Sequence, residues 1–394
     1  MNKSDLDRNA QMLRGTLARR GYMRWWHSFV GIEESTGRSR TFFVEYFIIN
    51  LALGGEHPIL GLHPYFKKRG MKPSYVMIKA GVFPVGAADS VAAVDVSEAF
   101  DAFDPSSKQL HAFYPISSLK ATGRPLVMQI GDCFYSENRI RGLVDVTEKE
   151  ARHRSLMTDE GYMEWDLEVH KAVSCHTGSL SGTLFTALRA LNSFWHAEGI
   201  RTFYQGQVIL DGKLYRVDPE SCCGYADKHW GRSYNHPWLQ LSSGSISSQR
   251  TGRELKHSAF AVDGCCSRFF FFPLKRRLMI QLSYTGEDFE FFFARPGSFS
   301  RFRWKIKETN KRFIWHIRAQ NKDALIKISG CCRKEFMTSL RYETPDGTNP
   351  AHPPMGGGAG FGTIQIFRRT SAGNQLIDTL SFDNALFEYG SRMP

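Results

Sequence analysis

The sequence lacks a long apolar run. No stretch reaches the ~18 residues that a membrane-spanning helix needs, and the longest candidate, residues 42–53, is interrupted by Glu45 and Asn50. The N-terminus also lacks the apolar core of a signal peptide. We therefore expect a cytoplasmic protein without a transmembrane helix.

The common catalytic motifs are absent as well. The chain has no Cys-x-x-Cys, no His-Glu-x-x-His, no Gly-x-Ser-x-Gly elbow and no Gly-Lys-Ser/Thr phosphate loop. These absences argue against a zinc ribbon, metal-dependent hydrolysis, serine hydrolysis and nucleotide binding, and we expect neither a metal nor a cofactor. Six of the eight cysteines lie in adjacent pairs, and in a reducing compartment they are expected to be free thiols that pack as small apolar residues.

Aromatic residues are abundant, with 30 Phe, 14 Tyr and 8 Trp in 394 residues. Aromatic side chains favour strands and large apolar interiors. Twelve of the Phe lie between residues 260 and 313. The composition therefore predicts a β-rich protein with a large aromatic interior or an aromatic-lined cavity.

The net charge is +12, and one basic segment is regular. In Arg301–Lys307 four basic residues alternate with Phe302, Trp304 and Ile306, and residues 312–318 nearly repeat the pattern. Alternation predicts strands with one apolar face and one wet face. The basic face is either a solvated surface or a peripheral contact with anionic lipid, whereas bulky apolar partners on the other face argue against nucleic-acid binding.

Most of the remaining chain also has the pattern of strands. Residues 42–50 form an apolar strand that places Glu45 on one face with Phe43 and Phe47, where this carboxylate needs a partner or must stay protonated. Asp211-Gly212 between two apolar runs predicts a tight hairpin. The fold class is therefore all-β and mainly antiparallel. A few short helices are expected over residues 1–20, 147–158 and 179–197, and a glycine-rich loop over residues 345–362.

One segment combines residues suited to acid chemistry: Tyr225-Ala-Asp227-Lys-His229-Trp230-Gly, followed by Trp238-Leu-Gln240. Aromatic walls disfavour an ionised carboxylate and raise its pKa, which suits a general acid. The alternative is that Asp227 caps a turn and Trp230 fills the core.

This segment resembles the signature of tocopherol-cyclase-like proteins. Further matching pieces are Trp195-His196 before Gly199, the hairpin of residues 206–219, Gly161-Tyr-Met-Glu-Trp165-Asp and, more loosely, Gly21-Tyr-Met-Arg-Trp-Trp26. The motif is also remotely similar to that of carotenoid 1,2-hydratase-like proteins and their lipocalin-like relatives, which include fungal Diels–Alderases.

The resemblance implies two calycin- or lipocalin-like β-barrel or β-sandwich domains, which we place at residues 1–235 and 236–394. It also implies a small hydrophobic substrate, an isoprenoid or prenylated quinol, that is protonated at a double bond and cyclised. The catalytic residues expected from it are Asp227 as proton donor, Tyr225, His229 and His196. The expected substrate-binding residues are Trp195, Trp230, Trp165, Trp26, Glu45, Trp238 and Gln240.

Two other functions remain open from the sequence. A lipocalin-like carrier would bind a hydrophobic ligand without chemistry. A pericyclase or hydratase of the same fold would use the same cavity for a different reaction.

Overall fold

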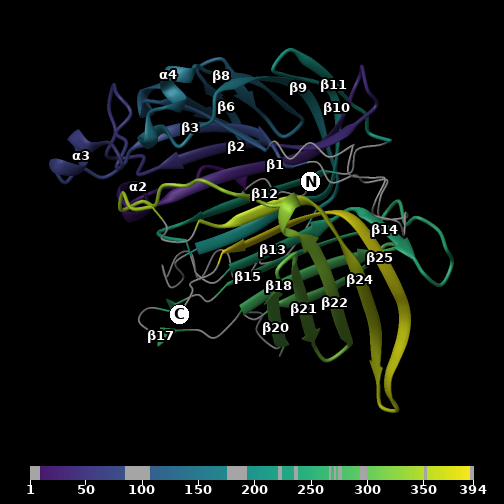
Figure 1. The fold of residues 1–394 in the computed structure, drawn as a ribbon. Helices are drawn as coiled ribbons and strands as arrows, with labels where there is room; N and C mark the ends of the chain where they lie inside the picture. Colours follow the sequence, from purple (N-terminus) through teal and green to yellow (C-terminus); the bar gives the residue numbers. More distant parts are fainter. Residues whose placement is uncertain are drawn as a thin grey trace.

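The computed structural model of the chain describes residues 9–84, 107–174, 193–220, 224–234, 238–265, 268–269, 272–273, 277–292, 300–349 and 353–390. Two large antiparallel sheets dominate it (Figure 1), so the all-β prediction is confirmed. Within these residues, no helix is long and apolar enough to cross a bilayer.

The first sheet has twelve strands, in the order β4-β3-β2-β1-β11-β10-β9-β8-β7-β6-β5, with β12 paired to both β1 and β10. Its strands are β1 Tyr22–Glu33, β2 Ser39–Ile49, β3 Tyr75–Val82, β4 Lys108–Tyr114, β5 Leu119–Thr122, β6 Val127–Ile130, β7 Cys133–Tyr135, β8 Arg139–Val146, β9 Gly161–Val173, β10 Ser193–Leu210, β11 Lys213–Val217 and β12 Gly224–Gly231.

The second sheet has eleven strands, in the order β19-β18-β15-β13-β25-β24-β22-β21-β20, with β14 beside β25 and β23 beside β24. Its strands are β13 Trp238–Ser243, β14 Ser245–Ser248, β15 Ala259–Cys265, β18 Arg277–Tyr284, β19 Glu287–Phe292, β20 Arg301–Glu308, β21 Arg312–Gln320, β22 Ala324–Arg333, β23 Thr338–Ser339, β24 Met355–Thr370 and β25 Gly373–Gly390. Strands β16 (Arg268–Phe269) and β17 (Phe272–Pro273) form a separate pair. The first sheet thus ends before residue 232 and the second starts at Trp238, while the division into two domains at residue 235 stays a prediction.

Helices are few and short. They are α2 Thr16–Arg19, α3 Pro64–Lys68, α4 Glu148–Ala151 and the 3₁₀ turns η3 Ile116–Ser118, η4 Arg154–Leu156 and η5 Lys334–Phe336. The helix expected over residues 147–158 is present in shortened form, and of the one expected over residues 1–20 the structure has Thr16–Arg19, while residues 1–8 lie outside the described residues. Thr147 and Glu150 form a capping box at the start of α4.

The expected helix over residues 179–197 is wrong at its C-terminal end. Ser193–Ala197 belong to β10, where Trp195 pairs in register with His229 of β12. Residues 179–192 lie outside the described residues. Sheet pairing on two sides outweighs the helical spacing of a few apolar residues.

Two hairpins agree with the sequence pattern. Leu210 and Lys213 pair across Asp211-Gly212, and both turn residues have positive φ (49° and 79°), as a type I′ turn requires. Strands β20 and β21 pair antiparallel, with Trp304 buried and the alternate basic residues exposed. The predicted inward and outward faces of this hairpin are confirmed.

The glycine-rich loop expected over residues 345–362 is wrong in its second half, because Met355–Gly362 are part of β24. A Cβ atom at Gly360 would lie 2.0 Å from the ring of Phe387, and one at Gly362 would lie 2.2 Å from the Ser329 carbonyl oxygen. The glycines therefore allow close packing in a strand.

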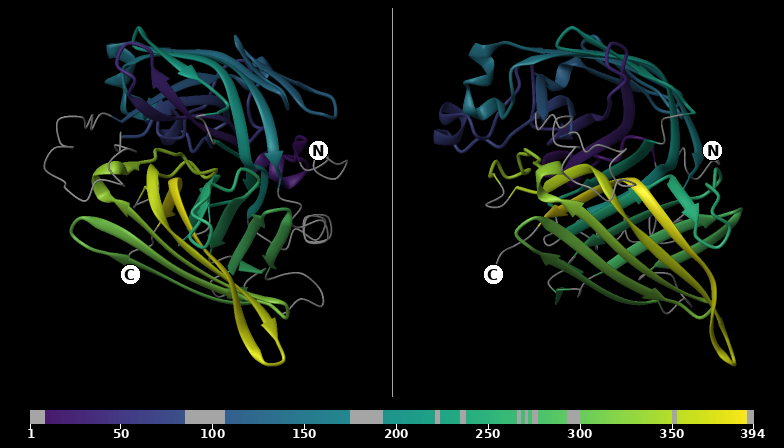
Figure 2. Two further views of the ribbon diagram at one scale, coloured as in Figure 1. Left: turned by 90° about the vertical axis from the view of Figure 1, so that its right-hand side faces the viewer. Right: turned by 45° about the vertical axis from the view of Figure 1, so that its right-hand side comes forward.

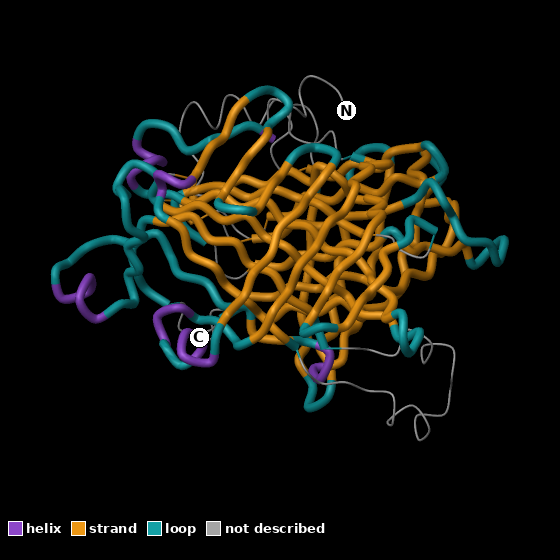
Figure 3. Tube along the Cα trace, turned by 90° about the horizontal axis from the view of Figure 1, so that it is seen from above, coloured by secondary structure: helices purple, strands orange, loops and turns teal. Residues whose placement is uncertain are grey.

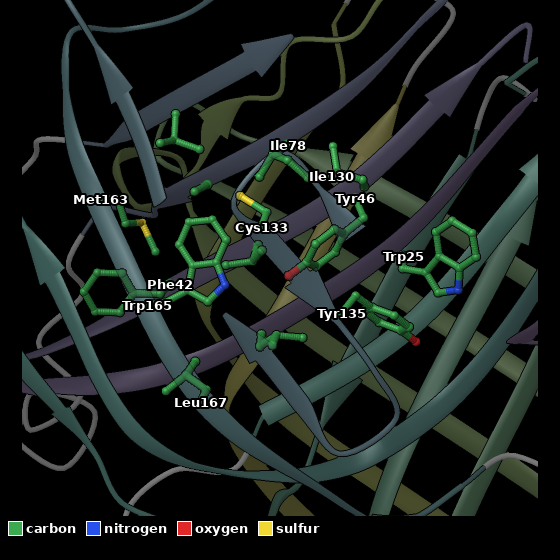
Figure 4. Packing of buried hydrophobic residues seen from close by; sticks show 14 of the residues in the cluster. Trp25, Phe42, Tyr46, Ile78, Ile130, Cys133, Tyr135, Met163, Trp165 and Leu167 are labelled. Atoms are coloured by element: carbon green, nitrogen blue, oxygen red, sulfur yellow. The ribbon is translucent and has the colours of Figure 1, made fainter. Parts of the chain in front are cut away.

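Each sheet curves around its own apolar core. The first core contains Trp25, Tyr46, Cys133, Tyr135 and Trp165, packed as Figure 4 shows. The second contains Phe260, Phe289, Phe291, Phe313 and Trp315, so several residues of the aromatic-rich C-terminal segment line its interior. Cys133, Cys331 and Cys332 are free thiols.

The two sheets stack with their strands crossing (Figures 2 and 3). A third apolar cluster lies between them and draws on both, with Trp26, Phe43 and Trp195 from the first sheet and Ala261 and Leu386 from the second. Charged side chains also lie in this layer, and they make up the candidate site.

Candidate functional site

A row of four residues crosses the first sheet on the face that meets the second sheet. Lys79 of β3 pairs in register with Glu45 of β2, Glu45 pairs with Trp26 of β1, and Trp26 pairs with Asp227 of β12. Side chains at paired positions share a face of the sheet. Three ionisable groups from distant parts of the chain are thus brought into one line, and all are fully buried.

A second row faces the first from the other sheet. Gln240 of β13 pairs with Glu388 of β25 on one side and with Asp263 of β15 on the other. The two rows meet where the Gln240 amide nitrogen donates a hydrogen bond of 2.6 Å to Asp227. The site is therefore built jointly by both sheets.

Asp227 accepts four hydrogen bonds on a single oxygen, Oδ2. The donors are Gln240 Nε2 at 2.6 Å, the Tyr225 hydroxyl at 2.8 Å, Trp195 Nε1 at 3.0 Å and His229 Nε2 at 3.1 Å. Tyr225 is held in turn by Gln240, whose amide donates to the phenol oxygen at 2.9 Å. Such a set of donors stabilises the ionised carboxylate.

The expected raised pKa of Asp227 is therefore wrong. Burial acts to raise this pKa, but the charge and hydrogen bond of His229, the positive charge of Arg24 and the Tyr225 hydroxyl together lower it to about 2. Burial lowers the pKa of His229, while the charge of Asp227 acts in the opposite direction, and the ring donates through Nε2 to the carboxylate. The sequence pattern identified the aromatic residues around Asp227 but not that they donate hydrogen bonds to it.

The other oxygen of Asp227 is unoccupied. Oδ1 is buried and accepts no hydrogen bond from any described residue. The same holds for Gln240 Oε1 and for both carboxyl oxygens of Glu388. Buried polar atoms are normally paired, so these acceptors are available to the hydrogen-bond donors of a ligand.

Arg24 of β1 is the cation at the centre of this layer. Its guanidinium donates to the Tyr342 hydroxyl at 2.7 Å and lies 3.6 Å from Glu388 and 3.9 Å from Glu45. It also lies over the rings of Trp26 and Trp238, 5.5 and 5.6 Å from their centroids. Arg24 therefore connects residues of both sheets through charge and ring contacts.

The carboxyl groups that face Asp227 from the second sheet have raised pKa values, whereas the pKa of Asp227 is lowered. Burial raises the pKa of Asp263 to about 8 and that of Glu388 to about 7, with the charge of Asp227 acting in the same direction. Burial also raises the pKa of Glu45 and lowers that of Lys79 to about 8. One ionised carboxylate thus faces carboxyl groups that hold their protons near neutral pH, which is an arrangement for paired base and acid roles.

Most of the residues predicted from the sequence come together here. Asp227, Tyr225, His229, Trp195 and Gln240 form the hydrogen-bond cluster. Trp26 and Trp238 lie against Arg24, and the Trp238 ring also meets the His229 ring edge-on. Glu45 lies in the same row as Asp227.

Three predicted residues lie elsewhere. His196 pairs in register with Lys228, one position away from Asp227, so its side chain lies on the opposite face of the sheet. Trp230 packs in the first core, where it stacks on Phe194 with ring centroids 5.4 Å apart, and Trp165 is buried in the same core. The two-residue period of the strand separates all three from the site.

Arg24, Lys79, Asp263 and Glu388 were not predicted from the sequence. A signal existed for Lys79 and Asp263, because each is the one charged residue of an otherwise apolar strand. Tyr342 lies outside any strand and carried no such signal.

No group of three or more His, Cys, Asp or Glu side chains among the described residues is suitably placed to hold a metal ion.

Comparisons with known proteins give distant structural similarities. No family model and no curated protein matches the chain. Among solved structures, a Nitrosomonas europaea protein described as a candidate AttH aligns with 99% of this chain and 96% of its own at 10% identity and a TM-score of 0.46. Kievitone hydratase from Nectria haematococca aligns with 93% of this chain and 89% of its own, at 10% identity and a TM-score of 0.38. At these values the function has to be argued from the site itself.

Proposed function

We propose that this protein is an enzyme that adds an oxygen nucleophile across a carbon–carbon double bond of a hydrophobic small molecule held between the two sheets. The observation that carries the proposal is the buried carboxylate of Asp227, with four donors on one oxygen and none on the other. Burial raises the pKa of the opposite Asp263 to about 8 and that of Glu388 to about 7.

In this proposal Asp227 is the proton acceptor and a facing carboxyl group is the donor. Oδ1 of Asp227 accepts the hydrogen of the nucleophilic hydroxyl or water. Asp263, which forms no ion pair with a described residue, gives its proton to one alkene carbon while the oxygen bonds to the other. One proton is given and one is taken, so the charge balances.

The residues between the two sheets favour a hydrophobic substrate that carries hydroxyl groups. Trp26, Phe43 and Trp195 supply apolar surface, and the unpaired acceptors on Asp227 and Gln240 favour a ligand that brings O–H donors. A carboxylate or phosphate ligand would be repelled by the same oxygens. Together with the resemblance to tocopherol-cyclase-like proteins, this favours cyclisation of a prenylated hydroquinone, while water as the nucleophile would make the enzyme a hydratase.

The position of Asp227 also differs from the position expected of this residue in a carrier protein without catalytic activity. A surface aspartate paired with Lys228 or Arg232 would favour a binding protein without chemistry. Asp227 is instead fully buried, and Lys228 lies on the other face of β12.

The test is an assay of the purified protein with a geranylated hydroquinone kept reduced. We expect a cyclic isomer of unchanged mass, or a product heavier by one water for a hydratase. In D₂O, the protonated carbon should gain one deuterium.

Asp227→Asn should lower turnover by a factor of about 10² to 10⁴, the range that general acid–base groups contribute, because the amide can still accept the four hydrogen bonds but cannot take a proton. Exposed Asp132→Asn is the matched control and should be fully active. Full turnover by Asp227→Asn would overturn the mechanism, and binding without turnover by the unaltered protein would favour a carrier.

A further inference from the structure

The outer face of β20, β21 and β22 carries positive charge only. At its outward positions lie Arg301, Arg303, Lys305 and Lys307 of β20, Arg312, His316 and Arg318 of β21, and Lys327 and Arg333 of β22. All of these except Arg333 are exposed. The other outward positions of the three strands hold no Asp or Glu, so this basic face extends over three neighbouring strands (Figure 1).

The strand register places like charges directly opposite each other. Arg303 pairs with Arg318 and Arg318 pairs with Lys327, while Lys305 lies opposite the imidazole of His316. Like charges at paired positions destabilise a sheet. None of these five side chains forms an ion pair with a described residue. The nearby ion pairs Lys334–Glu308 and Arg333–Glu335 lie at the ends of the strands.

The basic face is separate from the candidate site. Strands β13, β15, β18 and β25 contribute residues to the layer that faces the first sheet, whereas β20 is the last strand at one edge of the second sheet. The inward face of β20–β22 is filled by core residues such as Trp304, Trp315 and Ile328. The charges therefore serve neither the proposed reaction nor the packing of the core.

We propose that this basic face binds the surface of a bilayer that contains anionic lipids. Adjacent strands lie about 4.8 Å apart, and alternate residues on a strand lie about 6.8 Å apart, so the charges form a two-dimensional array that matches a plane of phosphate groups. Basic residues near such a surface contribute additively to binding. The outward positions carry no aromatic ring, as a single-stranded nucleic acid would need for base stacking.

The experiment is co-sedimentation of the full chain with vesicles of phosphatidylcholine alone or with 30% phosphatidylserine, at about 0.1 M and 0.5 M salt. We expect binding only to the anionic vesicles and loss of binding at high salt. The variant R303Q/K305Q/R318Q should bind about a hundredfold more weakly, at about fivefold for each basic residue removed.

A charge-matched variant distinguishes binding through this basic face from an effect of the net charge alone. K120Q/R141Q/K149Q removes three exposed basic residues from the first half of the chain, and it should bind like the unaltered protein. Equal losses in the two variants, salt-resistant binding to neutral vesicles, or tight binding to an oligonucleotide with none to anionic vesicles would each overturn the proposal.

Discussion

Two aspartates within the same buried layer show how strongly local surroundings set protonation. Asp227 receives four hydrogen bonds on Oδ2, and its pKa falls to about 2. Asp263, on β15 of the facing sheet, forms no ion pair with a described residue, and burial raises its pKa to about 8. The residue type is the same, so the number of donors decides which of the two can accept a proton and which can give one.

The raised pKa of Asp263 predicts a pH-dependent cost to folding. In the unfolded chain this carboxyl ionises near pH 4, whereas in the folded chain it keeps its proton up to about pH 8. The folded state therefore binds more protons between these values, and the free energy of unfolding falls as pH rises. Asp263→Asn removes this dependence.

Urea unfolding at pH 5 and pH 7.5 measures the effect. Relative to the unaltered protein, Asp263→Asn should gain up to about 3 kcal/mol of stability between the two pH values. The exposed Asp288→Asn on β19, which β18 separates from the strand of Asp263, is the control and should show no such gain. If the difference in unfolding free energy between Asp263→Asn and the unaltered protein were the same at both pH values, Asp263 would be ionised in the folded state.

At the scale of elements, β24 depends on glycines that lie under an aromatic ring. Its pairing with β25 shifts register at Gly357, Gly360 and Gly362. Phe387 of β25 fills the space left at Gly360, and its ring also meets Trp315, with centroids 4.4 Å apart. The glycines thus fix where the strand bends and where the ring inserts.

Gly360→Ala should destabilise the protein by about 1–3 kcal/mol, because the added methyl group overlaps the Phe387 ring in a packed core. Urea or thermal unfolding measures the change. Gly55→Ala is the control, since no atom lies within 4 Å of its Cβ position, and it should change stability by less than about 0.5 kcal/mol. Equal stability of the two variants would contradict the packing described here.

At the scale of the whole molecule, Arg24 is the charge that holds the buried layer between the sheets together. It lies 3.9 Å from Glu45 of its own sheet and 3.6 Å from Glu388 of the other, and it donates to Tyr342. Removal of one partner from a buried ionic group leaves the others without compensation.

Arg24→Met should therefore cost about 3–5 kcal/mol of unfolding free energy. Much of this loss should return in R24M/E45Q/E388Q, where the carboxylates left without Arg24 are neutral. The exposed pair of Arg139 with Asp166 gives the control, because Arg139→Met should cost less than about 1 kcal/mol. A triple variant no more stable than Arg24→Met would show that Arg24 acts through packing alone.

The sequence by itself determined the strands and their two faces. Alternation with a period of two is a local property, and it correctly placed Glu45 apart from Tyr46 and the basic residues of β20 apart from Trp304. The turn at Asp211-Gly212 was equally local. The motif around Asp227 identified one strand of the site, because Tyr225, Asp227 and His229 share a face by alternation.

Only the tertiary structure decided what those faces meet. Gln240 reaches Asp227 from another sheet, and Asp263 and Glu388 flank Gln240 through strand pairings that the sequence does not encode locally. The same pairings turned residues 193–197 and 355–362 into strands and left Trp165, His196 and Trp230 on faces away from the site. The protonation of Asp227 followed from these contacts, because a carboxyl pKa depends on donors and charges within a few ångströms and not on neighbours along the chain.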